Sequence, residues 1–202
     1  PPRPPPPPRA PGGGPAAGEN SQTMLPSRRE LEERAASDPE AAFRLGLVRL
    51  FQDRDPEGSL AALRQAVRAR VEPWSRQARV SAAQVLLATE RPQQAAFELR
   101  KALGDDGQDL TGALARSLLV DALRTLGKTA EAERLRESQK DALSRLAAGE
   151  GPERARAQAW LGYELKHDGE RRRARSSFEA ALASGELPDE EREAVQRALE
   201  SL

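Results

Sequence analysis

His167 is the only histidine in this chain of 202 residues, and histidine is the side chain most often used in acid–base catalysis. Acid–base or nucleophilic catalysis needs a carboxylate and a nucleophile around such an imidazole, and a metal site needs further ligands at matched spacing. No Ser–His–Asp arrangement and no His-rich metal spacing can be assembled around His167. It stands beside Asp168 and Gly169 at the end of an expected helix, which favours a solvated, helix-terminal role.

Two other features associated with chemistry are excluded by their context. The glycines at 12–14 do not form a phosphate-binding loop, because no strand precedes them and no Gly-Lys-Ser/Thr follows. The chain has no cysteine, which excludes disulfides, thiolate metal sites and cysteine nucleophiles. We therefore expect no catalytic residues, no cofactor and no metal, and we expect that the protein is not an enzyme.

The densest group of charged side chains is the run ERRRARSS at residues 170–177. Such a run has the chemistry to bind a phosphate or an acidic partner, or to be phosphorylated by a basophilic kinase. It begins an expected helix, however, and its charges are spread around that helix with Asp168 and Glu179 nearby. We interpret the run as a solvated helix face.

The overall composition argues against nucleic acid and membranes as main partners. The 32 basic and 32 acidic side chains cancel, which removes the usual electrostatic attraction to phosphate backbones and anionic lipids. No apolar run approaches the roughly 18 residues needed to span a bilayer, so we expect no direct membrane insertion. The excess of arginine over lysine, with much alanine and proline, is typical of a bacterial GC-rich genome.

Residues 1–26 form a separate segment rich in proline and glycine. Such a composition cannot bury a core, and we expect a disordered linker that begins as an extended polyproline II stretch. An alternative is that Pro4, Pro7 and Arg9 form a PxxPxR ligand for an SH3-like groove. The chain does not begin with methionine, which favours a removed N-terminal signal or anchor and a bacterial envelope or periplasmic location, with the cytoplasm as the alternative.

The helices that must position any functional surface follow this linker, and their clearest pattern lies at residues 160–181. A Leu161-Gly162 pair is followed by a turn glycine and then by Ala174, Phe178 and Ala181. Small and aromatic residues at this spacing lie where two paired antiparallel helices touch. The run therefore predicts a helix–turn–helix unit.

The same pattern recurs upstream in degraded form. Ala132, Ala95 and Ser59 take the place of Ala174, and these anchors lie 36, 37 and 42 residues apart in chain order. The third unit fits least well, since Arg136 and Gln139 stand where the fourth unit has its aromatic and its second small residue. Four such units predict an array of stacked hairpins.

On these motifs, the segment from about Pro39 to Pro188 resembles the tetratricopeptide repeat family, whose period is roughly 34 residues. The resemblance implies an all-α fold, an α-solenoid of about four repeats that spans residues 27–202. Residues 188–202 read as a further amphipathic helix that caps the array with a polar outer face. No segment alternates with the period of two that a strand requires.

Short polar motifs predict where the helices begin. Ser27 with Glu30 and Ser37 with Glu40 have the spacing of capping boxes. The remaining expected starts are Asp55-Pro56, Pro73-Trp74, Arg91-Pro92, Thr111, Thr129 and Pro152. We expect Trp74 and Trp160 to pack between units.

The resemblance also implies a binding surface, because the first helices of such repeats line a concave groove that holds a peptide or a partner helix. The groove-facing positions, carried over by alignment, are Gln77, Gln84, Leu87, Ser117, Asp121, Arg124, Arg156, Tyr163, Lys166 and His167. The first unit offers apolar residues instead, among them Phe43, Leu47 and Phe51. The family's lysine and asparagine clamp for a terminal carboxylate is therefore absent, and these residues either bind an apolar partner or pack beneath the helix at 27–36.

We therefore expect a non-catalytic scaffold that docks a protein or peptide segment in the groove of a tetratricopeptide-like array. One alternative is a homo-oligomerisation module, in which the apolar first unit or the last helix pairs in a homodimer. Another is an accessory domain of a larger cell-envelope or secretion assembly.

Overall fold

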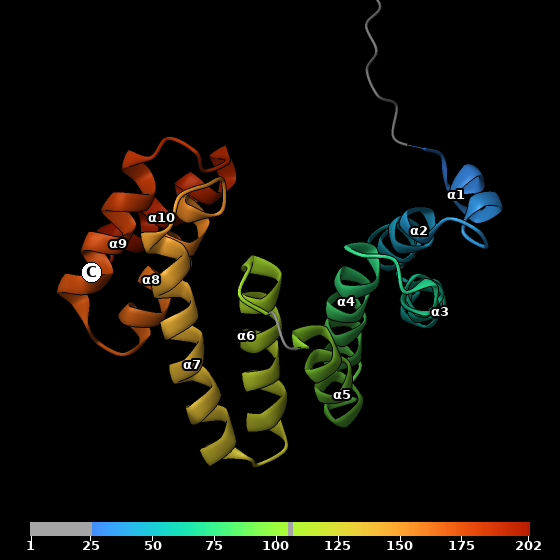
Figure 1. Ribbon diagram of the computed structural model, residues 1–202, viewed down its shortest axis with the longest axis horizontal. Helices are drawn as coiled ribbons and strands as arrows, with labels where there is room; N and C mark the ends of the chain where they lie inside the picture. The colour runs from blue at the N-terminus through green and yellow to red at the C-terminus, as the bar shows by residue number, and fades with distance from the viewer. Residues whose placement is uncertain (1–25, 105–106) are drawn as a thin grey trace, which may run out of the picture.

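A computed structural model describes residues 26–104 and 107–202 of the chain (Figure 1). The expected linker at 1–26 lies outside the described residues, except for Pro26. Every regular element in the described part is an α-helix, as the sequence predicted. The helices are α1 (Arg28–Arg34), α2 (Pro39–Phe51), α3 (Pro56–Ala69), α4 (Trp74–Ala88), α5 (Pro92–Leu103), α6 (Leu110–Thr125), α7 (Thr129–Ala148), α8 (Arg154–His167), α9 (Arg171–Ala183) and α10 (Asp189–Glu200).

The helices form four consecutive hairpins arranged in a curved row (Figure 1). We call α2, α4, α6 and α8 the A helices and their hairpin partners α3, α5, α7 and α9 the B helices. Each helix packs on the next along the chain, and α4 also contacts both α2 and α6. Stacking of neighbouring hairpins is the arrangement that defines a helical-repeat solenoid.

Two predicted helix caps agree with the sequence motifs. Ser27 and Glu30 form the complete capping box of α1, in which each side chain bonds the other residue's backbone N–H. Asp55 accepts a hydrogen bond from the Gly58 N–H at the start of α3, and Pro56 follows it in the first turn. The aspartate and proline serve complementary roles there, because proline has no N–H to leave unpaired.

Three other predicted caps are wrong by one or two residues. Asp38, rather than Ser37, caps α2 by accepting hydrogen bonds from the N–H groups of Glu40 and Ala41 at 2.9 and 3.2 Å. Asp109, rather than Thr111, caps α6 through the Gly112 N–H. Thr129 is the first helical residue of α7 and caps nothing. In the first two cases a nearby aspartate, a charged acceptor, takes the cap in place of the hydroxyl residue.

The core is made mainly of alanine and leucine, and it is interrupted once. One apolar cluster runs from Leu31 in α1 to Ala132 in α7, and a second runs from Ala155 in α8 to Ala198 in α10. A third, small cluster around Leu143 draws on α6, α7 and α8 and shares Trp160 and Leu161 with the second cluster. Trp74 packs against Phe43, and Trp160 packs against both C-terminal clusters, as expected for residues between units.

The interruption falls where the third unit departs from the repeat pattern. Arg136 and Gln139 are buried on α7, at the positions that Phe178 and Ala181 occupy on α9. A guanidinium and an amide cannot extend an apolar core, so the contact between α7 and α8 is polar along this stretch. The third and fourth units are therefore joined partly by hydrogen bonds and ion pairs.

Candidate functional site

A cavity of about 260 Å³ opens between the A helices α6 and α8, with α7 as its floor. Its lining combines five of the ten residues that the repeat alignment predicted with four residues that it did not. The predicted ones are Ser117, Asp121, Arg124, Tyr163 and His167, and the others are Val120, Arg136, Gln139 and Glu164. Residues from two successive repeats thus meet around one space, which we call the α6–α8 cavity.

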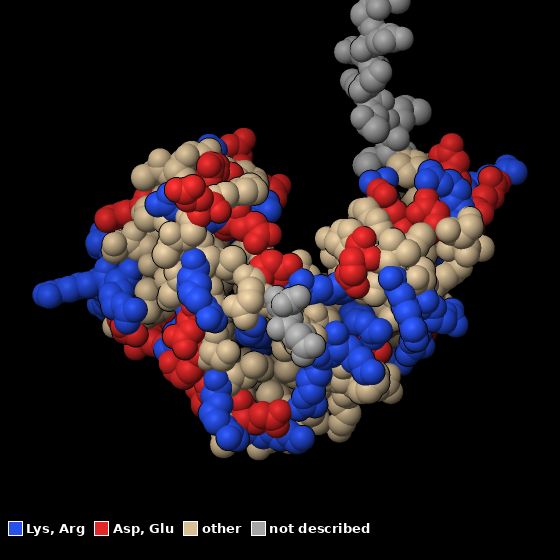
Figure 2. Space-filling model, in the orientation of Figure 1, with Lys and Arg blue, Asp and Glu red and all other residues tan. Residues whose placement is uncertain are grey.

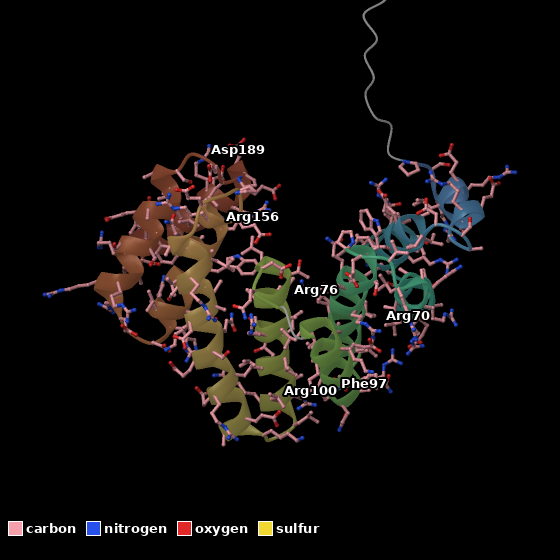
Figure 3. All side chains as sticks on the ribbon, viewed as in Figure 1. Arg70, Arg76, Phe97, Arg100, Arg156 and Asp189 are labelled. Carbon is pink, nitrogen blue, oxygen red and sulfur yellow. The ribbon has the colours of Figure 1, made fainter. Side chains whose placement is uncertain are left out.

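Two predicted groove residues instead hold the last helix in place. Arg156 pairs with Glu191 of α10, with nitrogen–oxygen distances of 3.0 and 2.9 Å. Lys166 donates to the carbonyl oxygen of Ala198 at 3.1 Å and to the hydroxyl of Ser201. In Figure 3, Arg156 lies in the C-terminal arm close to Asp189 at the start of α10. Both residues therefore stabilise the end cap.

The remaining predicted groove residues are spread along α4. Gln77 lines a separate hollow near the start of that helix. Gln84 is exposed, while Leu87 is half-buried against the N-terminal core cluster. The structure does not bring these three residues to the α6–α8 cavity.

The floor of the cavity is an ion-pair network centred on Arg136. Its guanidinium donates to Glu164 Oε2 at 3.1 Å and to Asp168 Oδ1, and its Nη2 lies 3.0 Å from His167 Nδ1. Lys140 joins the network through Asp168 Oδ2 at 2.7 Å. The Arg136 side chain is only 10% exposed, so these bonds are largely protected from solvent.

The network sets the protonation of its carboxylate. Burial alone disfavours the charged form of Asp168, but hydrogen bonds from Lys140 and Arg136 outweigh that effect and lower its pKa to about 2. The hydrogen bond to Asp168 in turn raises the pKa of Lys140. These groups stay charged at neutral pH and act as a structural joint between α7 and α8.

The rim of the cavity has a different character. The Tyr163 ring packs edge-on against Phe178 with centroids 5.0 Å apart, yet the residue remains 40% exposed. Asp121 is also solvent-accessible, but neighbouring side chains crowd its carboxyl; this desolvation raises its pKa, and only Arg124 opposes the shift. An aromatic face and a poorly neutralised carboxylate therefore stand side by side at the opening.

The apolar first unit is only partly covered by α1. Leu47 and Val48 line a hollow of about 470 Å³ together with Leu31 of α1. Phe51, four residues after Leu47, remains 74% exposed. The expected packing beneath α1 therefore accounts for Leu47 and leaves Phe51 as an open apolar contact.

The side chains around the α6–α8 cavity offer charge and hydrogen bonding to a ligand. No group of three or more His, Cys, Asp or Glu side chains in the described ranges is placed to hold a metal ion. Among the described helices, none combines the length and apolarity that crossing a membrane requires. His167 does meet charged neighbours, but they are Arg136 and Asp168 of the structural network.

Comparison with known proteins bears on the fold. No protein-family model matches the chain, and no curated protein matches it in sequence. The solved structure of BtubC from P. vanneervenii is 18% identical, covers 86% of this chain and 77% of its own, and superposes with a TM-score of 0.56. MamA is 20% identical over 79% of this chain and 86% of its own, with a TM-score of 0.49. A Podospora anserina kinesin light chain with nearly identical TPR-like repeats is 19% identical over 87% and 86%, with a TM-score of 0.48.

The stacked hairpins and the likeness to BtubC define the architecture. This chain is an α-helical repeat protein with a tetratricopeptide-like fold, as the sequence resemblance implied. Its four hairpins are closed by α10, and its apolar core is broken between the third and fourth units.

Proposed function

We propose that the chain is a non-catalytic scaffold that docks a segment of a partner protein against its A helices. The observation that carries this proposal is the convergence of Ser117, Asp121 and Arg124 from α6 with Tyr163 and His167 from α8 on one open cavity. Side chains from successive repeats that share one space suit a ligand that runs across the repeats. A protein segment has that shape.

The rigidity of the cavity supports the same proposal. Arg136 fixes α7 to α8 beneath the opening, and the edge contact with Phe178 holds the Tyr163 ring. A preorganised surface loses less conformational entropy when a ligand binds. The upper edge of the molecule in Figure 2 is hollowed between the arm formed by α1–α4 and the arm formed by α8–α10.

The test compares two double variants of the full chain in a pull-down from cells that make the protein. Tyr163→Ala with Arg124→Glu alters the cavity rim, and the matched control is Phe97→Ala with Arg100→Glu. The control also removes an exposed aromatic residue and reverses an arginine paired with a glutamate, since Arg124 pairs with Glu133 and Arg100 with Glu131. Phe97 and Arg100 project from the B helix α5 at the lower edge of Figure 3.

We expect the cavity variant to lose its partner while circular dichroism shows unchanged helicity. The control variant should retain the partner. Equal capture by the cavity variant and the wild-type chain, or loss only in the control, would contradict docking against the A helices.

Self-association is a second candidate function, favoured by the exposed Phe51. An aromatic side chain that is 74% exposed at the end of α2 offers an apolar contact to a second copy. Light scattering over a range of concentrations should then show a dimer that Phe51→Ser dissociates. A wild-type chain that stays monomeric at every concentration would exclude this candidate.

A further inference from the structure

The two arginines that line the α6–α8 cavity are already engaged in ion pairs with groups of the protein itself. Arg124 donates to Glu133 at 2.8 Å. The Arg136 guanidinium is surrounded by Glu164, His167 and Asp168. An incoming acceptor would have to compete with the carboxylates of Glu133, Glu164 and Asp168 for these two positive charges.

The acceptors are in the opposite situation. Gln139 is only 3% exposed and uses its Nε2 to bond Glu164, while no donor among the described residues reaches its Oε1. No described donor bonds the Asp121 carboxylate either, although a hydroxyl bonds the backbone oxygen of the same residue. The hydroxyls of Ser117 and Tyr163, which also line the cavity, accept as well as donate. The amide oxygen of Gln139 and a rim carboxylate are therefore left to receive hydrogen bonds from a ligand.

Charge favours a cation in the same place. The only cation that opposes the crowding of the Asp121 carboxyl is Arg124, and Glu133 holds that side chain. A positive charge beside Asp121 would relieve the cost of keeping that carboxylate ionised. The partly exposed Tyr163 ring adds a face over which an ammonium or guanidinium group packs favourably.

We propose that the α6–α8 cavity receives a lysine or arginine side chain of the docked partner segment. The cationic group bonds the Asp121 carboxylate and the Gln139 amide oxygen, and its aliphatic stem packs against Tyr163. This inference rests on the proposed function, because it names what the docking surface selects. A carboxylate ligand is disfavoured, since it would meet the Asp121 carboxylate and compete with Glu133 and Glu164 for the two arginines.

The test selects peptide ligands directly and does not require the natural partner to be identified. A random dodecapeptide library displayed on phage is panned against the immobilised full chain. The selected peptides are then counter-screened against the Tyr163→Ala variant, which removes the aromatic face of the cavity and leaves its charges unchanged. We expect peptides that depend on the cavity and share one lysine or arginine at a fixed position.

The second step measures the contribution of that basic residue. A selected peptide should bind the wild-type chain about tenfold more tightly than the same peptide with glutamine at the basic position, as expected for a charge-assisted hydrogen bond. Asp121→Asn should abolish most of this preference. Asp141→Asn, which removes an exposed carboxylate on α7, should leave the preference unchanged. Synthetic peptides with lysine or with arginine at the position show which cation is preferred.

Folding is monitored separately, so that a lost preference is interpretable. Because the pKa of Asp121 is raised in the folded protein, Asp121→Asn should melt at or slightly above the wild-type temperature at pH 7. Cavity-dependent peptides without a basic residue, or a preference that survives Asp121→Asn, would overturn the inference and leave the proposed function intact. A library that yields no cavity-dependent peptide would overturn both.

Discussion

The ring of Phe178 on α9 lies so close to Gly162 on α8 that a Cβ atom on the glycine would come within 2.6 Å of two ring carbons. The first hairpin has the same arrangement, in which a Cβ on Gly46 would lie 2.6 Å from Leu63 Cγ. Each glycine thus lets its two helices approach closely enough for the larger residue to fill the contact. These glycines belong to the Leu-Gly pairs from which the repeat pattern was recognised.

Gly162→Ala should therefore destabilise the fold although alanine favours helices. Overpacking a core typically costs about 1–3 kcal/mol, and the gain in helix propensity offsets at most about 1 kcal/mol. We expect a net loss of about 1 kcal/mol in the free energy of unfolding, measured with urea. The exposed substitution Ser176→Ala on α9 is the control and should be nearly neutral. A Gly162→Ala protein as stable as this control would show that the contact is looser than described.

Removal of Arg136 should weaken the joint between the third and fourth units. Arg136→Ala leaves Glu164 without its counter-ion and Asp168 with Lys140 alone, and breaking a buried ion pair from one side costs about 3 kcal/mol or more. Arg136→Met fills the same space without a charge. If the ion pairs contribute more to stability than the packing of the side chain does, this variant should be as unstable as Arg136→Ala. Urea unfolding measures the free energy of unfolding of both variants. Full rescue by methionine would indicate that packing, rather than the ion pairs, joins these units.

The low pKa of Asp168 predicts how the free energy of unfolding falls at acidic pH. Its folded-state pKa of about 2 lies below the unfolded value of roughly 3.9, so the stabilisation is fully present above about pH 4 and is lost as the pH falls toward about 2. The shift corresponds to roughly 2.5 kcal/mol. The stability difference between the wild-type chain and Asp168→Asn should shrink over this window. A difference that stays constant from pH 5 to about 2 would contradict the ion-pair assignment.

The cap of α2 allows a matched pair of substitutions. Asp38→Ala removes the acceptor for two backbone N–H groups and should cost about 1 kcal/mol. Ser37→Ala should change stability little, because the Ser37 hydroxyl only reaches the Arg34 carbonyl oxygen at 3.4 Å. Thermal melts of the two variants distinguish the roles. Equal destabilisation by both would favour the capping box that the sequence suggested.

The general fold was predictable because its signals are local. Small residues at hairpin contacts, prolines in first turns and turn glycines recur along the chain, and each acts within one or two helices. The caps that were assigned to the wrong residues show the limit of predicting structure from local motifs. At the starts of α2 and α6 an aspartate, Asp38 or Asp109, caps the helix in place of a nearby hydroxyl residue. The choice between them depends on the backbone geometry of the preceding loop, and short sequence motifs do not specify that geometry.

The candidate site was only half predictable, for a related reason. Ser117, Asp121, Arg124, Tyr163 and His167 follow from the position of each residue in its own repeat. Arg136, Gln139 and Glu164 enter the cavity because the third unit lacks its aromatic core residue, and that choice of partners depends on the packing of α7 against α8. The sequence did carry a signal, namely two polar residues at core positions of one repeat.

The central claim, that a partner segment docks against the A helices, is tested most directly by amide hydrogen exchange of the full chain with and without a selected peptide. The account predicts slower exchange in α6 (Leu110–Thr125) and α8 (Arg154–His167), with little change in the B helices α3 and α5. Slower exchange confined to α3 and α5, with α6 and α8 unchanged, would contradict it.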